Sequence, residues 1–204
     1  MGLLIENSEI PSRTKIGGLP MDVSGFKWPV CRACSRSMQF VAQIMLSDST
    51  DPIWNSRPES LLIFMCQNDP GMCNDWDANS GGNAVVVATP GSVQIHAPEN
   101  GETVLPLETF VSLKPYDSSV KDQTDDDNYV DAVNENELVL GKIGGDPLWI
   151  QADETPECDC GSRMRFVALL EERGGGGINF GGGGAGYVFA CTDCRDKAKF
   201  LWQS

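Results

Sequence analysis

The chain has 204 residues, and 29 acidic against 15 basic residues give it a formal net charge of −14 at pH 7. This length suits one large domain or two small fused ones. The acidic balance argues against binding to nucleic acid or to an anionic membrane surface, since both need clustered lysine and arginine. It favours a basic partner or a cationic ligand, with solubility as the simpler interpretation of the charge. No apolar run approaches the roughly 20 residues of a membrane span and the N-terminus lacks a signal-peptide pattern, so we expect a cytoplasmic protein.

One sequence plan occurs twice along the chain. Residues 15–20 (KIGGLP) stand before the first cysteine pair, and residues 142–147 (KIGGDP) stand before the third. Similar apolar segments then follow, at residues 38–43 (MQFVAQ) and 164–169 (MRFVAL). The spacing between matched positions changes by only one residue at each loop, so we interpret the chain as internally duplicated.

Short apolar runs predict a strand-rich fold. Each repeat has two runs of roughly four to eight residues, rich in Phe, Val and Ile and bounded by Gly, Pro or Asp, which favours strands over helices. Further β-type runs between residues 84 and 113 predict hairpin strands that complete the sheet of the first half. The sequence thus predicts an α+β, mainly β fold with two pseudo-equivalent β-rich halves. The predicted strands of the repeats are residues 38–45, 61–65, 164–170 and 187–190.

Two stretches have a strongly biased composition. Residues 115–137 are acidic and poor in apolar side chains, which indicates a solvated linker or excursion. The three aspartates at 125–127 lack the alternating carboxylates and glycine of an EF-hand loop, so calcium binding is the weaker interpretation. Glycine runs at 174–177 and 181–184 indicate a flexible loop, with a lid over a ligand as the alternative. The predicted parts are residues 1–114, 115–137 and 138–204.

All eight cysteines fall in the two repeats, four in each. A structural zinc ion takes four tetrahedral sulfur or nitrogen ligands, and in a cytoplasmic protein closely spaced cysteines are more often metal ligands or redox groups than disulfides. We predict two structural zinc sites, while metal-free thiols or disulfides, iron, and pairing of cysteines across the repeats stay open. Four thiolates leave no open position for catalytic zinc. The predicted ligands are Cys31, Cys34, Cys66, Cys73, Cys158, Cys160, Cys191 and Cys194.

The sequence contains no motif of a known catalytic centre. The single histidine, His96, has no nucleophile motif beside it, and neither Gly-x-Ser-x-Gly nor His-Glu-x-x-His occurs. We therefore expect a protein that is not an enzyme. The alternative is a small-ligand-binding protein or enzyme that uses a cleft between the two halves, with Trp28, Trp149 and Gln43 as candidate ligand-binding residues and Trp54 as a further lining residue.

The repeated segments resemble those of a known family. Residues 15–20, the Trp28-Pro29 pair and residues 38–43 are similar to the opening of the bacterial YwqG-like family of unknown function. The cysteine pairs before the phenylalanine-containing strand also resemble the programmed cell death protein 2 family of eukaryotes. These resemblances imply an internally duplicated, mainly β fold, and the eukaryotic relatives are linked to escorting a ribosomal protein.

Together, these features predict a cytosolic zinc-binding protein that acts as a protein-interaction or chaperone-like module for a basic client.

Overall fold

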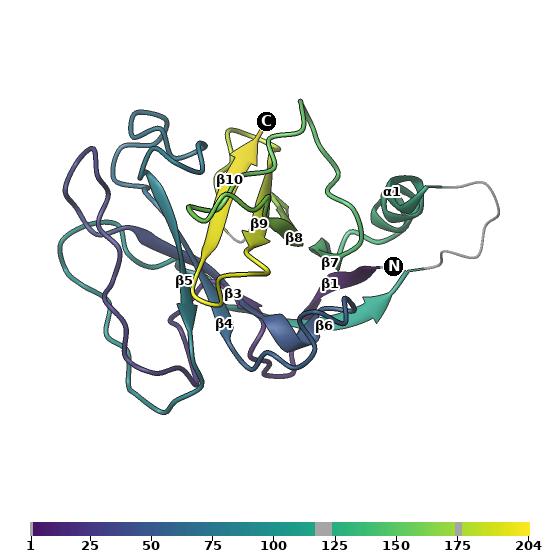
Figure 1. Cartoon of the computed structure of the whole chain (residues 1–204), viewed down its shortest axis with the longest axis horizontal. Helices are drawn as coiled ribbons and strands as arrows, with labels where there is room; N and C mark the ends of the chain where they lie inside the picture. The colour runs from purple at the N-terminus through teal and green to yellow at the C-terminus, as the bar shows by residue number, and fades with distance from the viewer. Residues whose placement is uncertain (1, 117–123, 174–176) are drawn as a thin grey trace.

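Ten β-strands form one continuous antiparallel sheet in the computed structural model, which describes residues 2–116, 124–173 and 177–204 (Figure 1). The mainly β composition is confirmed, whereas α+β is a poor description of these residues, which contain a single α-helix. The strands are β1 (Gly2–Ser8), β2 (Lys15–Ile16), β3 (Gln39–Met45), β4 (Ser60–Met65), β5 (Asn83–Ala88), β6 (Thr109–Pro115), β7 (Val139–Gly144), β8 (Arg165–Glu171), β9 (Ala185–Ala190) and β10 (Ala198–Gln203), and the helices are the 3₁₀-helix η1 (Leu46–Asp48) and α1 (Asp125–Glu135).

At the centre of the sheet, strand β1 pairs with β6 and β7, which lie far from it in the sequence. The strand order is β10-β9-β8-β7-β1-β6-β2-β3-β4-β5, so β1 and β6 lie in the middle, with β2–β5 of the first half on one side and β7–β10 of the second half on the other. The sheet curls until the edge strands β5 and β10 contact each other (Figure 1). The Trp202 backbone N–H on β10 donates to the Trp76 carbonyl at 3.2 Å, which closes this side of the molecule.

The strand registers of the two halves correspond. Ile16 lies opposite Ala42 in the first half, and Ile143 lies opposite Ala168 in the second. The β3–β4 pair has a register shift between Phe40 and Ala42, and the β8–β9 pair has one between Phe166 and Ala168. These bulges each contain one valine of the repeated Phe-Val-Ala segment, so similar sequences adopt the same irregularity.

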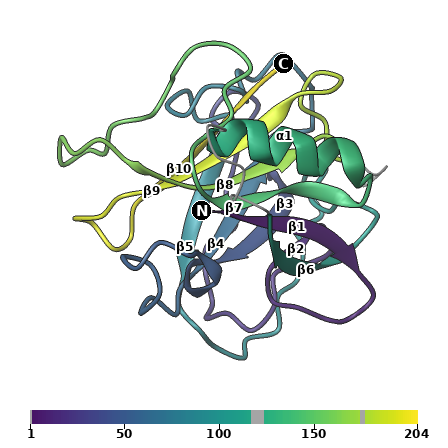
Figure 2. The same ribbon diagram turned by 90° about the vertical axis from the view of Figure 1, so that its right-hand side faces the viewer.

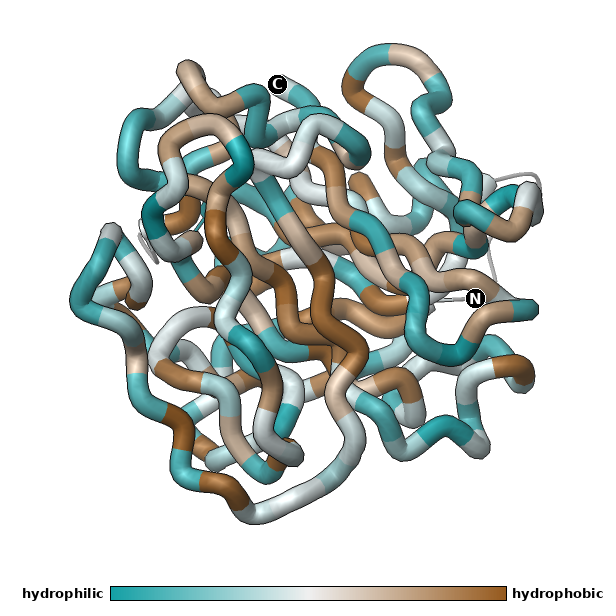
Figure 3. The backbone as a smooth tube through the Cα atoms, turned by 60° about the vertical axis from the view of Figure 1, so that its left-hand side comes forward, coloured by the Kyte–Doolittle hydropathy of each residue, from teal (hydrophilic) through white to brown (hydrophobic). Residues whose placement is uncertain are grey.

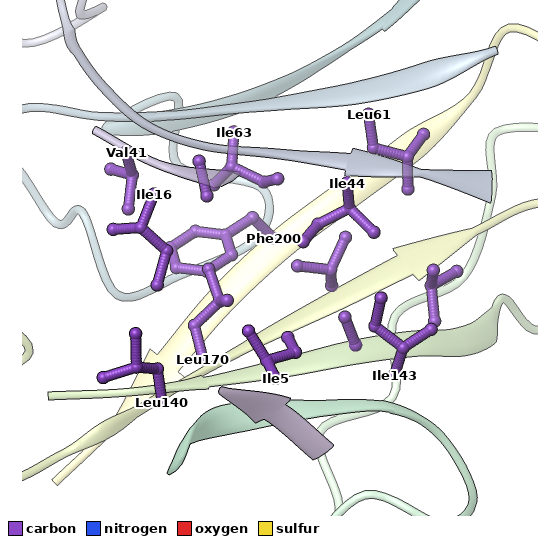
Figure 4. Close-up of a cluster of buried hydrophobic side chains, with 14 of the residues drawn as sticks. Ile5, Ile16, Val41, Ile44, Leu61, Ile63, Leu140, Ile143, Leu170 and Phe200 are labelled. Atoms are coloured by element: carbon purple, nitrogen blue, oxygen red, sulfur yellow. The ribbon is translucent and has the colours of Figure 1, made fainter. Parts of the chain in front are cut away.

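The concave face of the sheet encloses one apolar core. Figure 4 shows Ile16, Val41 and Ile63 of the first half turned toward Leu170 and Phe200 of the second. All five side chains are buried, and they belong to a single cluster. Each half thus buries its inward-facing residues against the other, which fits a chain too short for two independent cores.

The convex face carries two smaller apolar clusters, one on each half. Phe64 on β4 packs outward with Phe40 and Trp28, while Phe189 on β9 packs outward with Trp149. Brown hydrophobic segments therefore run through the strands in Figure 3, with teal hydrophilic segments mostly in the outer loops. Strands buried on both faces read as nearly continuous apolar runs, and the cysteines lie beside these outer clusters.

Two predictions between the repeats differ from the structure. Strands β5 and β6 are not a hairpin, since β5 is an edge strand and β6 is central, and residues 91–98 between them belong to no strand. The described part of the predicted acidic linker contains α1, which crosses the outer face of the second half (Figure 2), and residues 117–123 of that linker lie outside the described residues. The Thr124–Asp127 capping box of α1 and three aspartates in the first turn stabilise the N-terminus, and Tyr129 and Val133 bury one face.

The described part of the chain contains no helix with the length and apolar character needed to cross a membrane.

Candidate metal centres

The cysteines meet in two groups of four, one in each half. In each group the four sulfur atoms all lie within 4.8 Å of one another. The cysteines thus group within each half, which answers the question of pairing that the sequence left open. All eight are free thiols. The first group is Cys31, Cys34, Cys66 and Cys73, and the second is Cys158, Cys160, Cys191 and Cys194.

The first cysteine pair of each group lies on a tight backbone turn. The Cys31 N–H donates to the Arg36 carbonyl at 2.9 Å, and the Cys158 N–H donates to the Ser162 carbonyl at the same distance. The residue after the second cysteine has a left-handed backbone in both turns, with φ of 59° at Ser35 and 89° at Gly161. This shared conformation turns both thiols of a pair toward one point, so the local geometry is the same despite the different spacing of the cysteines.

The second pair of each group is delivered by the end of a strand. Cys66 directly follows β4 and Cys191 directly follows β9, and both are buried. In the second group, the Cys194 N–H donates to the Cys191 sulfur at 3.3 Å. In the first group, Asn68 Nδ2 donates to the Cys66 sulfur at 3.5 Å. Such N–H···S bonds stabilise thiolate and orient it toward a metal.

The distances between sulfur atoms suit a shared metal ion. Cys34 and Cys66 have their Sγ atoms 3.7 Å apart, and so have Cys160 and Cys191. A disulfide would need about 2.05 Å, whereas the edge of a tetrahedron with metal–sulfur bonds of about 2.3 Å is about 3.8 Å. Both groups can therefore hold a tetrahedral metal ion without rearrangement of the backbone.

The thiols within one group differ in acidity. Burial opposes ionisation of Cys34, but hydrogen bonds from the Arg36 backbone and the neighbouring thiols lower its pKa to about 7. Hydrogen bonds from Ser162 and neighbouring thiols lower the pKa of Cys160 to about 6. In contrast, hydrogen bonding to Cys160 together with burial raises the pKa of Cys194 to about 12. In the second group the Cys160 thiolate thus opposes ionisation of Cys194, and a bound cation removes that penalty.

The two groups differ in exposure. In the first group three cysteines are buried and Cys34 is half-buried, whereas in the second Cys160 is exposed. Gly161, beside it, has open space around its Cα. The second centre is therefore the more exposed of the two.

An ion-pair network joins the second centre to the first half. Arg195 follows Cys194 directly, and its guanidinium donates to Glu59 Oε1 at 2.9 Å. The other Glu59 oxygen pairs with Arg57 at 3.4 Å, and Arg57 also donates to the Arg195 carbonyl. Glu59 and Arg57 are both buried, so this network fixes the Cys191–Cys194 turn against the loop after η1.

The predicted ligand-binding residues lie in separate places. Gln43 is fully buried and exchanges two hydrogen bonds with the Met21 backbone, at 3.1 and 3.0 Å. Trp28 donates to the Met38 carbonyl at 2.8 Å on the first half, while Trp149 stacks on Tyr187 on the second. The structure does not bring these three residues together, and their role in ligand binding stays a prediction. The further lining residue, Trp54, is buried in the central core, and the single histidine, His96, is exposed.

Two buried lysines are features that the sequence analysis did not single out. Lys142 is fully buried, and its Nζ lies 3.1 Å from Asp125 and 3.6 Å from Asp126. Lys15, at the matching position of the first repeat, is equally buried and pairs with Glu108. Both lysines open a Lys-Ile-Gly-Gly segment. The recurrence of a charged residue inside an apolar strand is the sequence feature that could have identified them as buried ion-pair residues.

The second glycine run is bound to a carboxylate. One oxygen of Glu172 accepts the N–H groups of Phe180, Gly182 and Gly183 at 2.8 to 3.0 Å and that of Gly184 at 3.4 Å. Burial opposes ionisation, but these hydrogen bonds lower the pKa of Glu172. Residues 181–184 are therefore held in one conformation, unlike the predicted flexible loop, whereas residues 174–176 of the first run lie outside the described part.

The fold and the thiol geometry define a mainly β protein with two four-cysteine centres able to hold metal ions. The family model described as "Domain of unknown function (DUF1963)" matches residues 14–193, and the chain therefore belongs to this family. The match includes all of the first cysteine group and Cys158, Cys160 and Cys191 of the second. No curated protein matches the chain.

Proposed function

We propose that the protein binds two structural zinc ions and acts in the cytosol as a protein-interaction or chaperone-like module for a basic client. The observation that carries the first part is the pair of four-thiol groups, with sulfur atoms within 4.8 Å of one another in each. Among metals that accept four thiolates, zinc needs neither redox chemistry nor an open coordination site. Four sulfur ligands complete its shell, so its role here is to hold the turns in place.

Duplication of an ancestral half is part of this proposal. It is supported by the matched registers of Ile16 and Ile143, by the equivalent bulges in β3 and β8, and by the equivalent left-handed turn residues. Kinship to the YwqG-like proteins within the family remains part of the proposal too. The family match does not reach the programmed cell death protein 2 family, so the client role rests on charge.

Metal analysis of the purified chain tests the zinc centres. We expect two zinc ions per chain, and one per chain in Cys158→Ser, because removal of one thiol opens the second centre and leaves the first unaltered. Leu138→Ser, on the exposed surface away from both groups, is the matched control and keeps two. Less than about 0.2 metal ions per chain in a fully folded protein with eight titratable thiols would exclude the proposal.

Capture of basic proteins tests the client role. The net charge of −14 favours association with a cationic surface, and such association weakens as salt screens the charges. We expect binding of immobilised basic proteins at about 50 mM salt that falls several-fold at about 300 mM. Equal capture of basic and acidic proteins at both salt concentrations would contradict the client role while leaving the zinc centres in place.

Ligand binding between the halves is the second candidate. It is favoured by a groove of about 360 Å³ that lies between Asp51 of the first half and Arg165 and Phe166 of the second. Arg165 forms an ion pair with Asp51 across the groove at 2.6 Å. None of Trp28, Trp149 and Gln43 lines it, so a ligand here would need other contacts. A calorimetric screen of polar metabolites against wild type and Arg165→Ala tests this candidate, and ligands that bind both equally do not occupy the groove.

A further inference from the structure

The two four-cysteine groups contain the same pair of close sulfur atoms, but the two pairs differ in their access to solvent. The Sγ atoms of Cys34 and Cys66 lie 3.7 Å apart, and so do those of Cys160 and Cys191. In each pair the cysteine that follows a strand, Cys66 or Cys191, is fully buried. Its partner is half-buried in the first group and exposed in the second. The two pairs are thus matched in sulfur geometry and differ in exposure.

Hydrogen bonds fasten the surroundings of the first pair. Asn68 Nδ2 donates to the Ser37 carbonyl at 2.9 Å and to the Cys66 sulfur at 3.5 Å. The side-chain oxygen of Asn68 accepts the Glu102 N–H at 2.8 Å, and the Arg36 guanidinium donates to the Asn68 carbonyl at 2.7 Å. These bonds join the turn of the first two cysteines to the loop after β4 and to residues 100–102. The first pair is therefore held within a network of three chain segments.

The corresponding turn of the second group is open on its outer side. Gly161 follows Cys160 directly, and a Cβ at this position would have no atom within 4 Å beyond its own chain neighbours among the described residues. The Ser162 hydroxyl donates to the Asp193 carboxylate at the exposed surface, which joins the two turns of this group to each other. A small molecule from solvent therefore reaches the exposed Cys160 without any opening of the fold.

Oxidation of a cysteine to a disulfide has two structural requirements. The first is a thiolate that solvent reaches, since buried structural cysteines are inert, and the second is another thiol close enough to resolve the first product. Metal-binding cysteines are deprotonated, so they supply thiolates. Cys160 meets both requirements, because it is exposed and the Cys191 Sγ lies 3.7 Å away. The half-buried Cys34 has a close partner but less access to solvent.

We propose that Cys160 is an oxidation site at which hydrogen peroxide produces a disulfide to Cys191, while the first group stays reduced. The Cys160 thiolate attacks one peroxide oxygen, so that an S–O bond forms, the O–O bond breaks, and the departing hydroxide takes a proton from solvent to become water. The Cys191 thiolate then attacks the Cys160 sulfur, the S–S bond forms, the S–O bond breaks, and the second hydroxide is protonated to water. The two sulfur atoms lose two electrons, and the two peroxide oxygens gain them.

The disulfide leaves Cys158 and Cys194 as the remaining thiols of the second group. Two sulfur ligands do not complete the shell of a structural zinc ion, so oxidation opens the second centre. This consequence rests on the proposed zinc centres, whereas the disulfide itself depends on the thiols alone. Reduction by a dithiol restores the four-thiol group, and the oxidation is therefore a reversible control of the second centre.

Peptide mapping of the full, zinc-loaded chain tests the site. The reduced chain is exposed to hydrogen peroxide for graded times, and the remaining thiols are alkylated after unfolding with a chelator. We expect the Cys160–Cys191 disulfide to form about tenfold faster than any disulfide in the first group. Zinc in the folded chain should fall from two ions to one over the same time, and a dithiol reductant with added zinc should restore both.

Two cysteine variants separate this site from general thiol oxidation. In Cys160→Ser the buried thiol of Cys191 should stay reduced over the time in which the wild type is oxidised, because its partner is absent. Cys34→Ser is the matched control in the first group and should form the Cys160–Cys191 disulfide at the rate of the wild type. Oxidation of Cys191 at the wild-type rate in Cys160→Ser would overturn the inference.

The map of the wild-type chain also decides the inference without any variant. Equal rates in the two groups, or a first disulfide that does not join Cys160 to Cys191, would overturn it. If the chain carries no zinc before oxidation but this disulfide still forms first, the proposed zinc centres fail and the oxidation site stands. If two zinc ions and all eight thiols survive the peroxide, the oxidation site fails and the zinc centres stand.

Discussion

Replacement of Lys142 by methionine is expected to be among the most destabilising single changes in the second half. Its ammonium group is fully buried, 3.1 Å from Asp125 and 3.6 Å from Asp126, and lies over the ring of Tyr129. Methionine fills most of the space but leaves two carboxylates without their cation. Tyr116 and the Asp146 N–H still donate to Asp125, at 2.8 and 3.1 Å, which limits the loss.

The expected cost is about 3 kcal/mol. Breaking a buried ion pair on one side costs about 3–5 kcal/mol, and the lower end applies because Asp126 is partly exposed to water. For a chain of this size the melting temperature should fall by about 6–12 °C. Urea unfolding followed by tryptophan fluorescence measures the change in unfolding free energy. Lys197→Met, which removes the partner of Asp159 in an ion pair exposed on both sides, is the matched control and should cost less than about 1 kcal/mol.

A double-mutant cycle shows whether the charges are responsible. In an Asp125→Asn, Asp126→Asn background the Lys142→Met change should cost at least about 1.5 kcal/mol less than in the wild type. A cost below about 1 kcal/mol in the wild-type background, or the same cost in both backgrounds, would refute the ion-pair reasoning.

Two further changes probe the contacts that hold the loops. Glu172→Gln should cost about 2 kcal/mol of unfolding free energy at pH 7, because charge-assisted hydrogen bonds to the glycine loop are lost. Since the pKa of Glu172 is lowered in the folded state, its stabilising contribution is present above its unfolded pKa of about 4.3 and disappears as the pH falls through the folded value. The unfolding free energies of wild type and variant, measured by urea unfolding, should therefore converge near pH 3. A difference that persists undiminished at pH 3 would show that the carboxylate charge is not the cause. Glu59→Gln should lower the unfolding free energy by about 2–4 kcal/mol, because Arg57 and Arg195 lose their shared carboxylate. It should also speed the loss of zinc from the second centre to a chelator. An unchanged rate of zinc loss would show that the network does not support that centre.

The short apolar runs of the sequence were enough to predict several of the strands. The runs at 38–45 and 164–170 became β3 and β8, displaced by one residue at most, because a short apolar run between turn residues has few other stable conformations. The two cysteine groups were also predictable, since thiols at short spacing in a duplicated plan are brought together by the same turn. In these regions local sequence and global fold agree.

Long-range arrangement was not predictable from composition. The acidic sequence of α1 is typical of a linker because it has few apolar side chains, and the burial of Tyr129 and Val133 depends on a surface assembled by distant strands. The placement of β6 beside β1, far from β5, depends on pairing between residues about 100 positions apart, which no short motif encodes. The two hydrogen bonds between the Gln43 amide and the Met21 backbone likewise depend on the fold, and the ligand-binding role of Gln43 stays a prediction.

Counting metal in the folded chain tests the central claim most directly. Native mass spectrometry of protein purified without added metal should show the mass of the chain plus two zinc ions, with both lost together with tertiary structure under strong chelation. A fully folded chain that carries no metal, and whose unfolding free energy does not change on adding zinc, would contradict the claim that the eight thiols are metal ligands.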